Sequence, residues 1–408
     1  MQIVHQRCAG LDVHQQMVVA NARWFKGAAV HRDAATFETT TCGLMRMSDW
    51  LERHQVTHVA MEATGVYWRP VWHVLEGHFE LVLANAAHVR NVPGRKSDAN
   101  DACWLADLLA HGLIRPSFVP PTPIQNLRDL TRTRKQLVRE VAQHTLRIQK
   151  VLEDANIKIT GVISDLMGVS GRAILSAIIG GESDPEHLLA CTTGRLTAPR
   201  GQLIESLRGL TTDHHRFLLG LHLRQINALE EAIAEVECQI GRLIEPFRRC
   251  VELLTTMPGI SYTVAHMLVA EIGVDMNRFP SAGHLVAWAG LCPRLDESAG
   301  KRRSTRIRHG APWLKTTLVT AAWAAVGARN TYLRAQFCRL KGRRGPKKAI
   351  IAVAASMLTS SYHMLLKQVP YQDLGGSYFD QRDQSKVLHR LKRRIESLGY
   401  KVAIQPAA

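Results

Sequence analysis

Short apolar runs alternate with helical patterns in the first 110 residues, and two of these runs end in an acid. Residues 8–14 contain Asp12 near their end, and residues 58–65 contain Glu62 before a glycine turn. Strands that alternate with helices predict an α/β fold. Folds of this kind place their functional sites at the ends of the strands. A carboxylate in an apolar strand is costly unless it is hydrogen-bonded, paired or metal-bound. The simpler alternative is an acid at a strand end that faces water.

The surrounding patterns predict the rest of this layer. Apolar residues at helical or alternating spacing and the turn residues between them define the elements. The further elements expected are a strand at 17–22, a helix at 43–54, a helix at 68–76 and a strand at 81–85.

Asp98 and Asp101 stand three residues apart at the start of an amphipathic run. At this spacing both acids lie on one helical face, although Asp is also common as a helix cap. If Asp12 and Glu62 converge on them, the four carboxylates repel unless cations lie among them. Hard oxygen ligands select Mg²⁺ or Mn²⁺, and two such ions suit phosphoryl transfer on a nucleic-acid backbone.

The size and charge of the chain narrow its class. At 408 residues the chain is too long for one ordinary hydrophobic core, which predicts more than one domain. A net charge of +17 could serve solubility alone, but it favours binding to a nucleic acid or another polyanion. No apolar run reaches the ~18 residues of a membrane helix, and the N-terminus lacks the apolar core of a signal peptide. The eight cysteines form no C-x-x-C pair, which fits a reducing cytoplasm.

Two heptad-like patterns, at 124–151 and 219–247, predict long helices in the middle of the chain. Arg134 and His144 fill two seam positions of the first, and His222 is the exception in the second. Two such helices most simply pack on each other, within one chain or between subunits.

The first of these helices is strongly basic, which indicates either a solvated face or contact with a phosphate backbone. Its candidates for that contact are Arg128, Arg132 and Lys135. Pro246 should kink or end the second helix. Between the helices, residues 161–212 are expected to be an insertion of short helices with a structural role.

Ser298 precedes a small pair, Ala299 and Gly300, and a dense basic run. A loop serine is usually a turn residue. A hydroxyl among guanidinium groups is also well placed to meet a scissile phosphate, because the cations stabilise the charge of the transition state. The basic residues predicted to contact nucleic acid here are Arg294, Lys301, Arg302, Arg303, Arg306 and Arg308.

Residues 253–268 predict a helix, a tight turn and a helix; the turn could face a phosphate, but an ordinary αα-hairpin is the simpler interpretation. Core helices are expected at 315–329 and 349–367, and the polar tail from 375 onward is expected to be a loosely attached helix or a disordered arm. A second basic patch between the core helices consists of Arg339, Lys341, Arg343, Arg344, Lys347 and Lys348.

The blocks at 10–14, 61–68 and 94–102 resemble the three signature blocks of the DEDD transposases, insertion-sequence recombinases related to the Piv/MooV DNA invertases. The resemblance implies a RuvC-like N-terminal domain, an α/β RNase H-like fold with an acid tetrad that binds Mg²⁺ or Mn²⁺. The positions that match this tetrad are Asp12, Glu62, Asp98 and Asp101. Asp107 falls outside the matched block and is expected to be a surface or capping residue.

The blocks at 290–294, 297–301 and 309–314 resemble the C-terminal block of the same family. This implies that Ser298 is the nucleophile that joins covalently to a DNA end. One departure is Lys315, where many relatives carry Arg.

These observations predict a DNA transposase or site-specific recombinase of an insertion sequence. Paired strand exchange needs two active sites, hence a homodimer or homotetramer, and the resemblance implies a structured guide RNA and a nucleoid-associated place in a bacterial cytoplasm. The alternatives are a metal-dependent RuvC-like junction nuclease without a covalent serine intermediate, and a non-catalytic nucleic-acid-binding protein. The predicted segments are an RNase H-like domain at 1–122, a helical coiled-coil linker at 123–250, a mostly α-helical transposase domain at 251–370 and a basic tail at 371–408.

Overall fold

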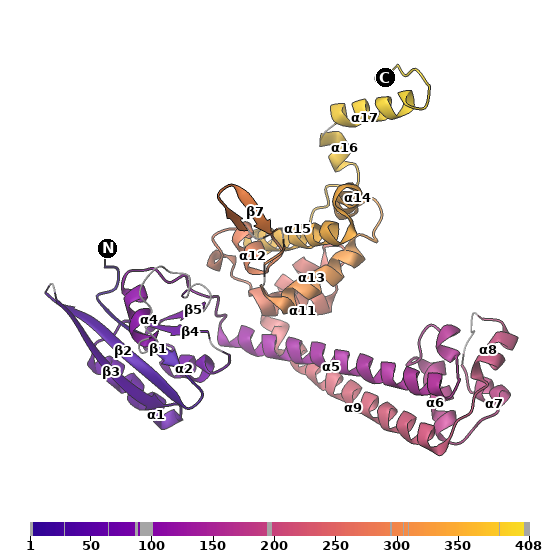
Figure 1. Ribbon diagram of the computed structural model, residues 1–408, viewed down its shortest axis with the longest axis horizontal. Helices are drawn as coiled ribbons and strands as arrows, with labels where there is room; N and C mark the ends of the chain where they lie inside the picture. Colours follow the sequence, from indigo (N-terminus) through magenta and orange to yellow (C-terminus); the bar gives the residue numbers. More distant parts are fainter. Residues whose placement is uncertain are drawn as a thin grey trace. The chain divides into compact units, whose positions relative to one another are not determined.

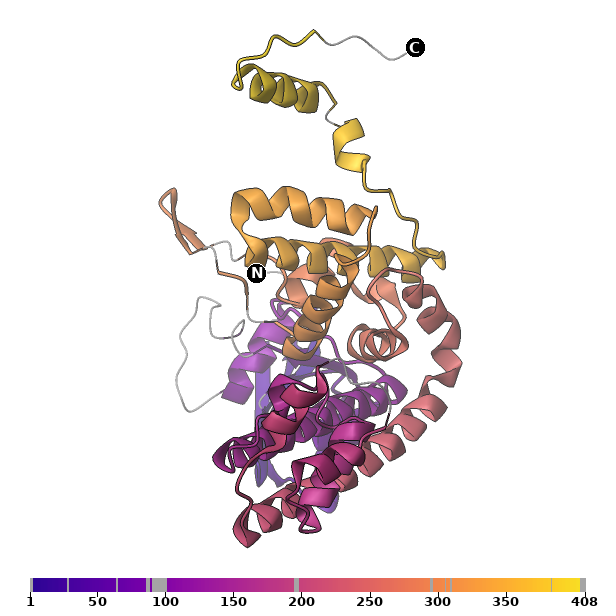
Figure 2. The same cartoon turned by 90° about the vertical axis from the view of Figure 1, so that its right-hand side faces the viewer.

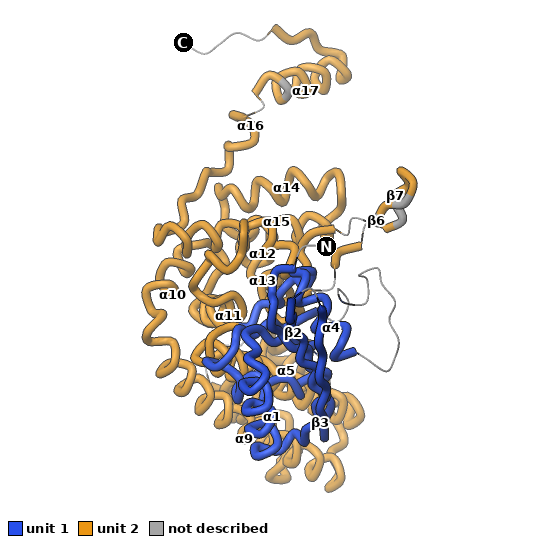
Figure 3. The backbone as a smooth tube through the Cα atoms, turned by 90° about the vertical axis from the view of Figure 1, so that its left-hand side faces the viewer, with its two compact units in different colours: residues 1–119 blue, residues 120–408 orange. Residues whose placement is uncertain are grey.

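The computed structural model divides the chain into two units, residues 1–119 and 120–408 (Figure 3). The residues that it describes are 3–27, 29–63, 65–85, 89, 101–193, 198–293, 296–304, 306–308, 310–382 and 384–403. Each unit has its own core and is treated separately below.

Unit 1 contains a mixed five-stranded sheet in the order β3-β2-β1-β4-β5 (Figure 1). The strands are β1 (Arg7–Val13), β2 (Met17–Lys26), β3 (Ala29–Glu38), β4 (His58–Glu62) and β5 (Glu80–Ala84). β1, β2 and β3 pair antiparallel, whereas β4 pairs parallel with both β1 and β5. The four strands predicted from the sequence are confirmed, and the edge strand β3 was missed.

The alternation of side chains along the strands divides unit 1 into two apolar layers. α1 (Thr41–Arg53) and α2 (Trp68–Leu75) cover one face of the sheet, where they pack on residues such as Leu11 and Met61. α4 (Asp101–Ala110) covers the opposite face and packs on residues such as Cys8. Strands that are buried on both faces explain the continuous apolar runs of the sequence.

Gly10 is where α4 lies directly on β1. A Cβ atom at this position would stand 2.1 Å from the carbonyl oxygen of Ala102 and 2.5 Å from the backbone nitrogen of Ala106. Any larger residue would therefore push the first turn of α4 away from the sheet.

Two long helices, α5 (Thr122–Asp154) and α9 (Asp213–Ile244), pack on each other within unit 2 (Figures 1 and 2). This confirms the packing predicted from the heptads, and α9 ends before Pro246 as predicted, in the short 3₁₀ helix η2 (Glu245–Phe247). The 161–212 insertion builds a core with the ends of both long helices. The short 3₁₀ helix η1 (Ile159–Gly161) leads into this insertion. Its helices are α6 (Val169–Ile179), α7 (Pro185–Ala190) and α8 (Arg200–Leu207).

The rest of unit 2 is mostly helical. Its elements are α10 (Arg248–Thr255), α11 (Tyr262–Ile272), η3 (Met276–Arg278), α12 (Ala282–Trp288), β6 (Asp296–Ser298), β7 (Lys301–Ser304), α13 (Pro312–Ala325), α14 (Tyr332–Arg344), α15 (Pro346–Lys367), α16 (Tyr378–Arg382) and α17 (Gln384–Glu396). α15 contacts α10, α12, α13 and α14. By length and composition α15 could cross a membrane, but over half of its most apolar stretch is buried in unit 2.

The turn between α10 and α11 packs against α13. Gly259 has φ 84°, and a Cβ atom there would stand 2.4 Å from the carbonyl oxygen of Ala321. Ser261 caps α11 by accepting from the backbone N–H of Val264 at 3.4 Å. These contacts favour the simpler interpretation of this segment, an αα-hairpin in which the glycine permits close packing.

Candidate active site

Asp12 and Glu62 lie next to each other at the ends of neighbouring parallel strands. β1 and β4 pair with Leu11 opposite Met61, so the residues that follow, Asp12 and Glu62, are also neighbours. Both point to the face that α4 covers, because Leu11 and Met61 belong to the layer on the other face. The carboxyl ends of parallel strands are where open α/β sheets place their sites.

Asp101 comes to the same end of the sheet as the first residue of α4. Its neighbour Ala102 lies against Gly10, two residues before Asp12 on the same face of β1. Asp12, Glu62 and Asp101 are all half-buried. The fourth predicted acid, Asp98, lies outside the described residues.

The donor set at this end of the sheet consists of carboxylate oxygens, which suits a hard divalent cation. Asp12 is 30% exposed, and its Oδ2 lies 3.1 Å from Nε2 of His14, so this carboxylate is accessible and already faces a polar group. Among the described residues, which exclude Asp98, no three His, Cys, Asp or Glu side chains are close enough together to hold a metal ion. The chemistry of the residues fits Mg²⁺ or Mn²⁺.

Asp107 joins α4 to two strands by ion pairs. Its Oδ1 lies 2.9 Å from Nε of Arg23 in β2 and 2.8 Å from Nη2 of Arg32 in β3. Arg23 is only 4% exposed and Asp107 is 26% exposed. Asp107 is partly exposed, as expected of a surface residue, but the sequence did not reveal that it pairs with arginines 75 and more residues away. An arginine within the apolar strand pattern was the signal that could have revealed the pair.

Two buried cysteines line the same face of the sheet. Burial raises the pKa of the Cys8 thiol to about 11, more than the nearby Arg23 lowers it. Burial also raises the pKa of the Cys103 thiol, against the opposing effect of Arg32. Thiols that stay protonated at neutral pH are packing residues and not nucleophiles.

Ser298 is the last residue of a β-strand, directly before a two-residue hairpin turn. It pairs with Lys301 across the β6–β7 hairpin, and the turn residues Ala299 and Gly300 have φ 50° and 72°. Positive φ at both positions is typical of the tight turns that match strand twist, and for Ala it is strained. The hairpin thus presents Ser298 beside a strained turn.

The basic residues around Ser298 are only partly described. Lys301, Arg306 and Arg308 are exposed to solvent. Arg294 and the side chains of Ser298, Arg302 and Arg303 lie outside the described residues.

The three basic residues predicted on α5 have intramolecular partners. Arg132 forms a bidentate ion pair with Glu271, in which its Nε donates to Oε1 at 2.7 Å and its Nη2 to Oε2 at 2.9 Å. The Glu271 side chain is 0% exposed. Arg128 donates to the backbone carbonyls of Ala270 and Glu271 at the end of α11. Each arginine thereby packs α5 on α11, whatever its role toward nucleic acid.

Lys135 fixes α5 to α13. Its Nζ donates to the hydroxyls of Thr316 and Thr317, both at 2.8 Å. Burial lowers the pKa of this ammonium group, and the charge of Arg139 lowers it further. The predicted contact of Lys135 with nucleic acid remains a prediction.

Two family models match separate stretches of the chain. Residues 9–157 match a model described as a transposase, and residues 251–338 match one described as a transposase of the IS116/IS110/IS902 family. The chain belongs to this transposase family. Members of the family are DNA-processing enzymes.

Two proteins of similar sequence agree with this assignment. The chain is 24% identical to the pilin gene-inverting protein of Moraxella bovis over 353 residues, which cover 82% of this chain and 89% of that protein. It is 29% identical to the insertion element IS110 43.6 kDa protein of Streptomyces coelicolor over 144 residues, 34% of each chain. A match to the structure of Thermus thermophilus RuvC covers 27% of this chain and 99% of that one, with 14% identity and a TM-score of 0.21.

Proposed function

We propose that this transposase is the recombinase of an insertion sequence, which cleaves and rejoins DNA strands through a serine nucleophile and an acidic metal site. The observation that supports this most is the β1–β4 register, which makes Asp12 and Glu62 neighbours at two strand ends, with Asp101 at the start of the helix that packs on the same face. The mixed sheet, with its order β3-β2-β1-β4-β5 and α4 across it, supports an RNase H-like, RuvC-like domain within residues 1–122.

The acids that would hold the ions in this proposal are Asp12, Glu62, Asp98 and Asp101. Bound Mg²⁺ or Mn²⁺ would supply positive charge that polarises a phosphoryl oxygen. The close packing of α4 on Gly10 keeps Asp101 beside β1, and the pairing of Asp107 with Arg23 and Arg32 fixes the rest of the helix.

The covalent step in the proposal belongs to Ser298. Its Oγ forms a bond to the scissile phosphorus and loses its proton, the bond from phosphorus to the leaving strand oxygen breaks, and that oxygen takes up a proton. A strand hydroxyl that attacks the phosphoserine then restores the serine and joins the new strands. The cationic residues that follow the hairpin turn stabilise the charge on the phosphate during both steps.

The proposal includes a homodimer or homotetramer, because exchange between two DNA ends needs two sites. It also includes a structured RNA from the element as guide, which the net charge of +17 would favour and the resemblance implies. The segments 123–250 and 251–370 are proposed as the helical linker and the serine-bearing domain.

Strand cleavage of the element's end DNA, assayed with the candidate RNA and Mg²⁺, tests the metal site. We expect Asp12→Asn to lower the cleavage rate by about 100-fold or more, since even groups that only support metal ligands cost about 10–100-fold. Asp33→Asn is the matched control, because Asp33 is 50% exposed on β3 and pairs with His54. Cleavage that survives both Asp12→Asn and a chelator would overturn the metal site.

A further inference from the structure

The C-terminal tail begins with an anchored segment. The backbone N–H of Tyr371 donates to Oγ1 of Thr256 at 2.9 Å, and Oδ1 of Asp373 accepts from the backbone N–H of Tyr332 at 2.9 Å. The ring of Phe379 in α16 stacks on that of Tyr332 with centroids 5.1 Å apart. The segment 371–379 is thus attached to Thr256, just after α10, and to Tyr332 of α14. The loose attachment expected from residue 375 onward remains a prediction for the residues after Phe379.

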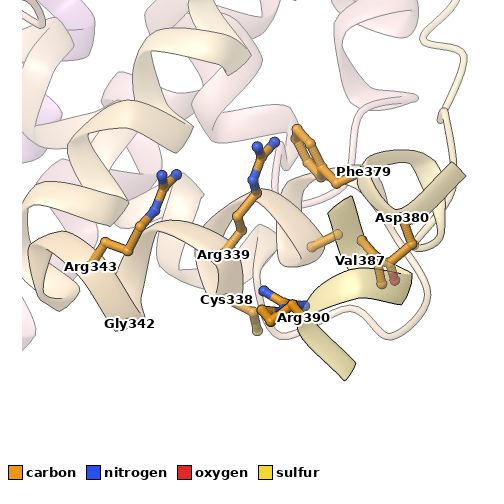
Figure 4. Close-up of a pocket in the computed structure, with 10 residues that line it drawn as sticks. Cys338, Arg339, Gly342, Arg343, Phe379, Asp380, Val387 and Arg390 are labelled. Carbon is orange, nitrogen blue, oxygen red and sulfur yellow. The ribbon is translucent and has the colours of Figure 1, made fainter. Parts of the chain in front are cut away.

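This attachment creates a cavity of about 690 Å³ between α14 and the two tail helices (Figure 4). Arg339 and Arg343 extend from α14, and Arg390 comes from α17. The guanidinium carbon of Arg339 lies 4.8 Å from the centre of the Phe379 ring. An aromatic face beside a guanidinium group orients the arginine.

The cavity carries an excess of positive charge. Against three arginines its lining contains one carboxylate, that of Asp380. In the described part of the chain, neither Arg343 nor Arg390 has a carboxylate within ion-pair distance. Like charges around one cavity destabilise it unless an anion lies between them, and the planar fork of a guanidinium group matches phosphate oxygens.

A second hollow lies along α17. It is lined by Ser385, His389, Arg390 and Arg393, so Arg390 borders both. Two basic hollows that share Arg390 offer positions for more than one phosphate, which favours a polymer over a free phosphate ion.

We propose that these two hollows, the tail site, bind the phosphodiester backbone of a nucleic acid without regard to its sequence. The phosphates would lie between Arg339 and Arg343 on α14 and Arg390 on α17. The tail site extends the proposed function by a further binding surface, and it rests on that function only in taking nucleic acid as the partner. It requires neither the acids of the sheet nor Ser298.

The test compares two full-length double variants with the same reduction in charge. R343Q/R390Q removes two arginines of the cavity, and R242Q/R249Q removes two exposed arginines of α9 and α10. Binding of each protein to a fluorescent DNA duplex and to an RNA hairpin, both of unrelated sequence, is measured across a salt series. A melting temperature equal to that of the wild type shows that each double variant is folded. The single variant Arg390→Gln, at an exposed position of α17, is a second and independent test.

We expect R343Q/R390Q to weaken binding about 10-fold and to reduce the slope of log affinity against log salt by about 2, because each arginine that is removed leaves one phosphate without its cation. Arg390→Gln should reduce the slope by about 1, and the control should leave it nearly unchanged. The probe whose binding weakens, duplex or RNA, identifies the source of the backbone. Equal weakening in the two double variants, or none in R343Q/R390Q, would overturn the proposal.

The result is separable from the proposed function. Strand cleavage of the element's end DNA is measured with the same double variants, because no residue of the tail site belongs to the proposed catalytic site. A protein that binds through the tail site but cleaves no DNA would refute the recombinase and keep the tail site. Cleavage by a protein whose R343Q/R390Q variant binds normally would do the reverse.

Discussion

Each unit contains a carboxylate that pairs with two arginines far from it in the sequence. The two units differ in which member of the ion pair is buried, the acid or the arginine. In unit 1 the arginine is buried, with Arg23 at 4% exposure and Asp107 at 26%. In unit 2 the acid is buried, with Glu271 at 0% exposure and Arg132 at 27%. Breaking a buried ion pair is costly because of the charge that is left behind. The two units should therefore respond in opposite ways to loss of the acid and loss of the arginine.

The largest effect is expected from Arg132→Met. It leaves the wholly buried Glu271 with Arg128, whose Nε is 3.8 Å away, as its remaining described ion-pair partner. We expect the free energy of unfolding to fall by about 3–5 kcal/mol, measured by urea denaturation at neutral pH. Arg139→Met, on the same helix, is the control. A decrease below about 1 kcal/mol would contradict the claim that Arg132 is the main partner of Glu271.

Asp107→Asn should have the next largest effect. It leaves Arg23 buried with no other carboxylate within ion-pair distance among the described residues. We expect the free energy of unfolding to fall by about 3 kcal/mol, toward the lower end of the range because Asp107 itself is partly exposed. Since Asp107 fixes α4, the same variant should also slow DNA cleavage, and unchanged stability would contradict the pairing.

Arg23→Met should cost much less than Asp107→Asn. It removes the buried charge and leaves Asp107 with Arg32, which is 43% exposed, and with solvent. Because Asp107 is partly exposed and keeps Arg32, no buried charge is left unpaired, so we expect a change below about 1 kcal/mol in the same denaturation experiment. If this variant proves less stable than Asp107→Asn, the contrast between the units fails.

The smallest effect on stability is expected at the contact between His144 of α5 and His222 of α9, where two histidines lie side by side. Nδ1 of His144 lies 3.2 Å from Nδ1 of His222, and burial, then the charges of His144 and Arg147, lower the pKa of His222. The unfolded chain therefore takes up the proton first as pH falls. Stability should be complete above the ordinary histidine pKa of 6.5 and decrease below it. His222→Gln should flatten this decrease in thermal melts, and an unchanged pH profile would contradict the assignment.

Local patterns in the sequence predicted those elements in which buried residues recur at a regular spacing. The strands β1, β2, β4 and β5 and the helix pair α5–α9 were found because their apolar residues recur at the spacing of a strand or a helix. β3 was missed because most of its residues are exposed and include Arg32 and Asp33, so no alternation marks this edge strand. Its existence depends on pairing with β2, which no local pattern encodes.

The candidate site was predictable only in part for the same reason. Asp12 and Glu62 could be placed at strand ends from local sequence, and the resemblance grouped them with Asp98 and Asp101. That Asp12 and Glu62 share a face follows from the β1–β4 register, which depends on residues 50 positions apart. The roles of Asp107 and Glu271 were hidden likewise, since their arginine partners lie 75 and 139 residues away.

The most direct test of the proposed mechanism is the detection of a covalent protein–DNA adduct. Wild type, Ser298→Ala and Ser304→Ala are incubated with the element's end DNA, its candidate RNA and Mg²⁺, and separated on a denaturing gel. Ser304 is the matched control, because it lies on β7 of the same hairpin. We predict an adduct with wild type and Ser304→Ala and none with Ser298→Ala. Strand cleavage that persists in Ser298→Ala would contradict the serine mechanism and leave a metal-dependent nuclease.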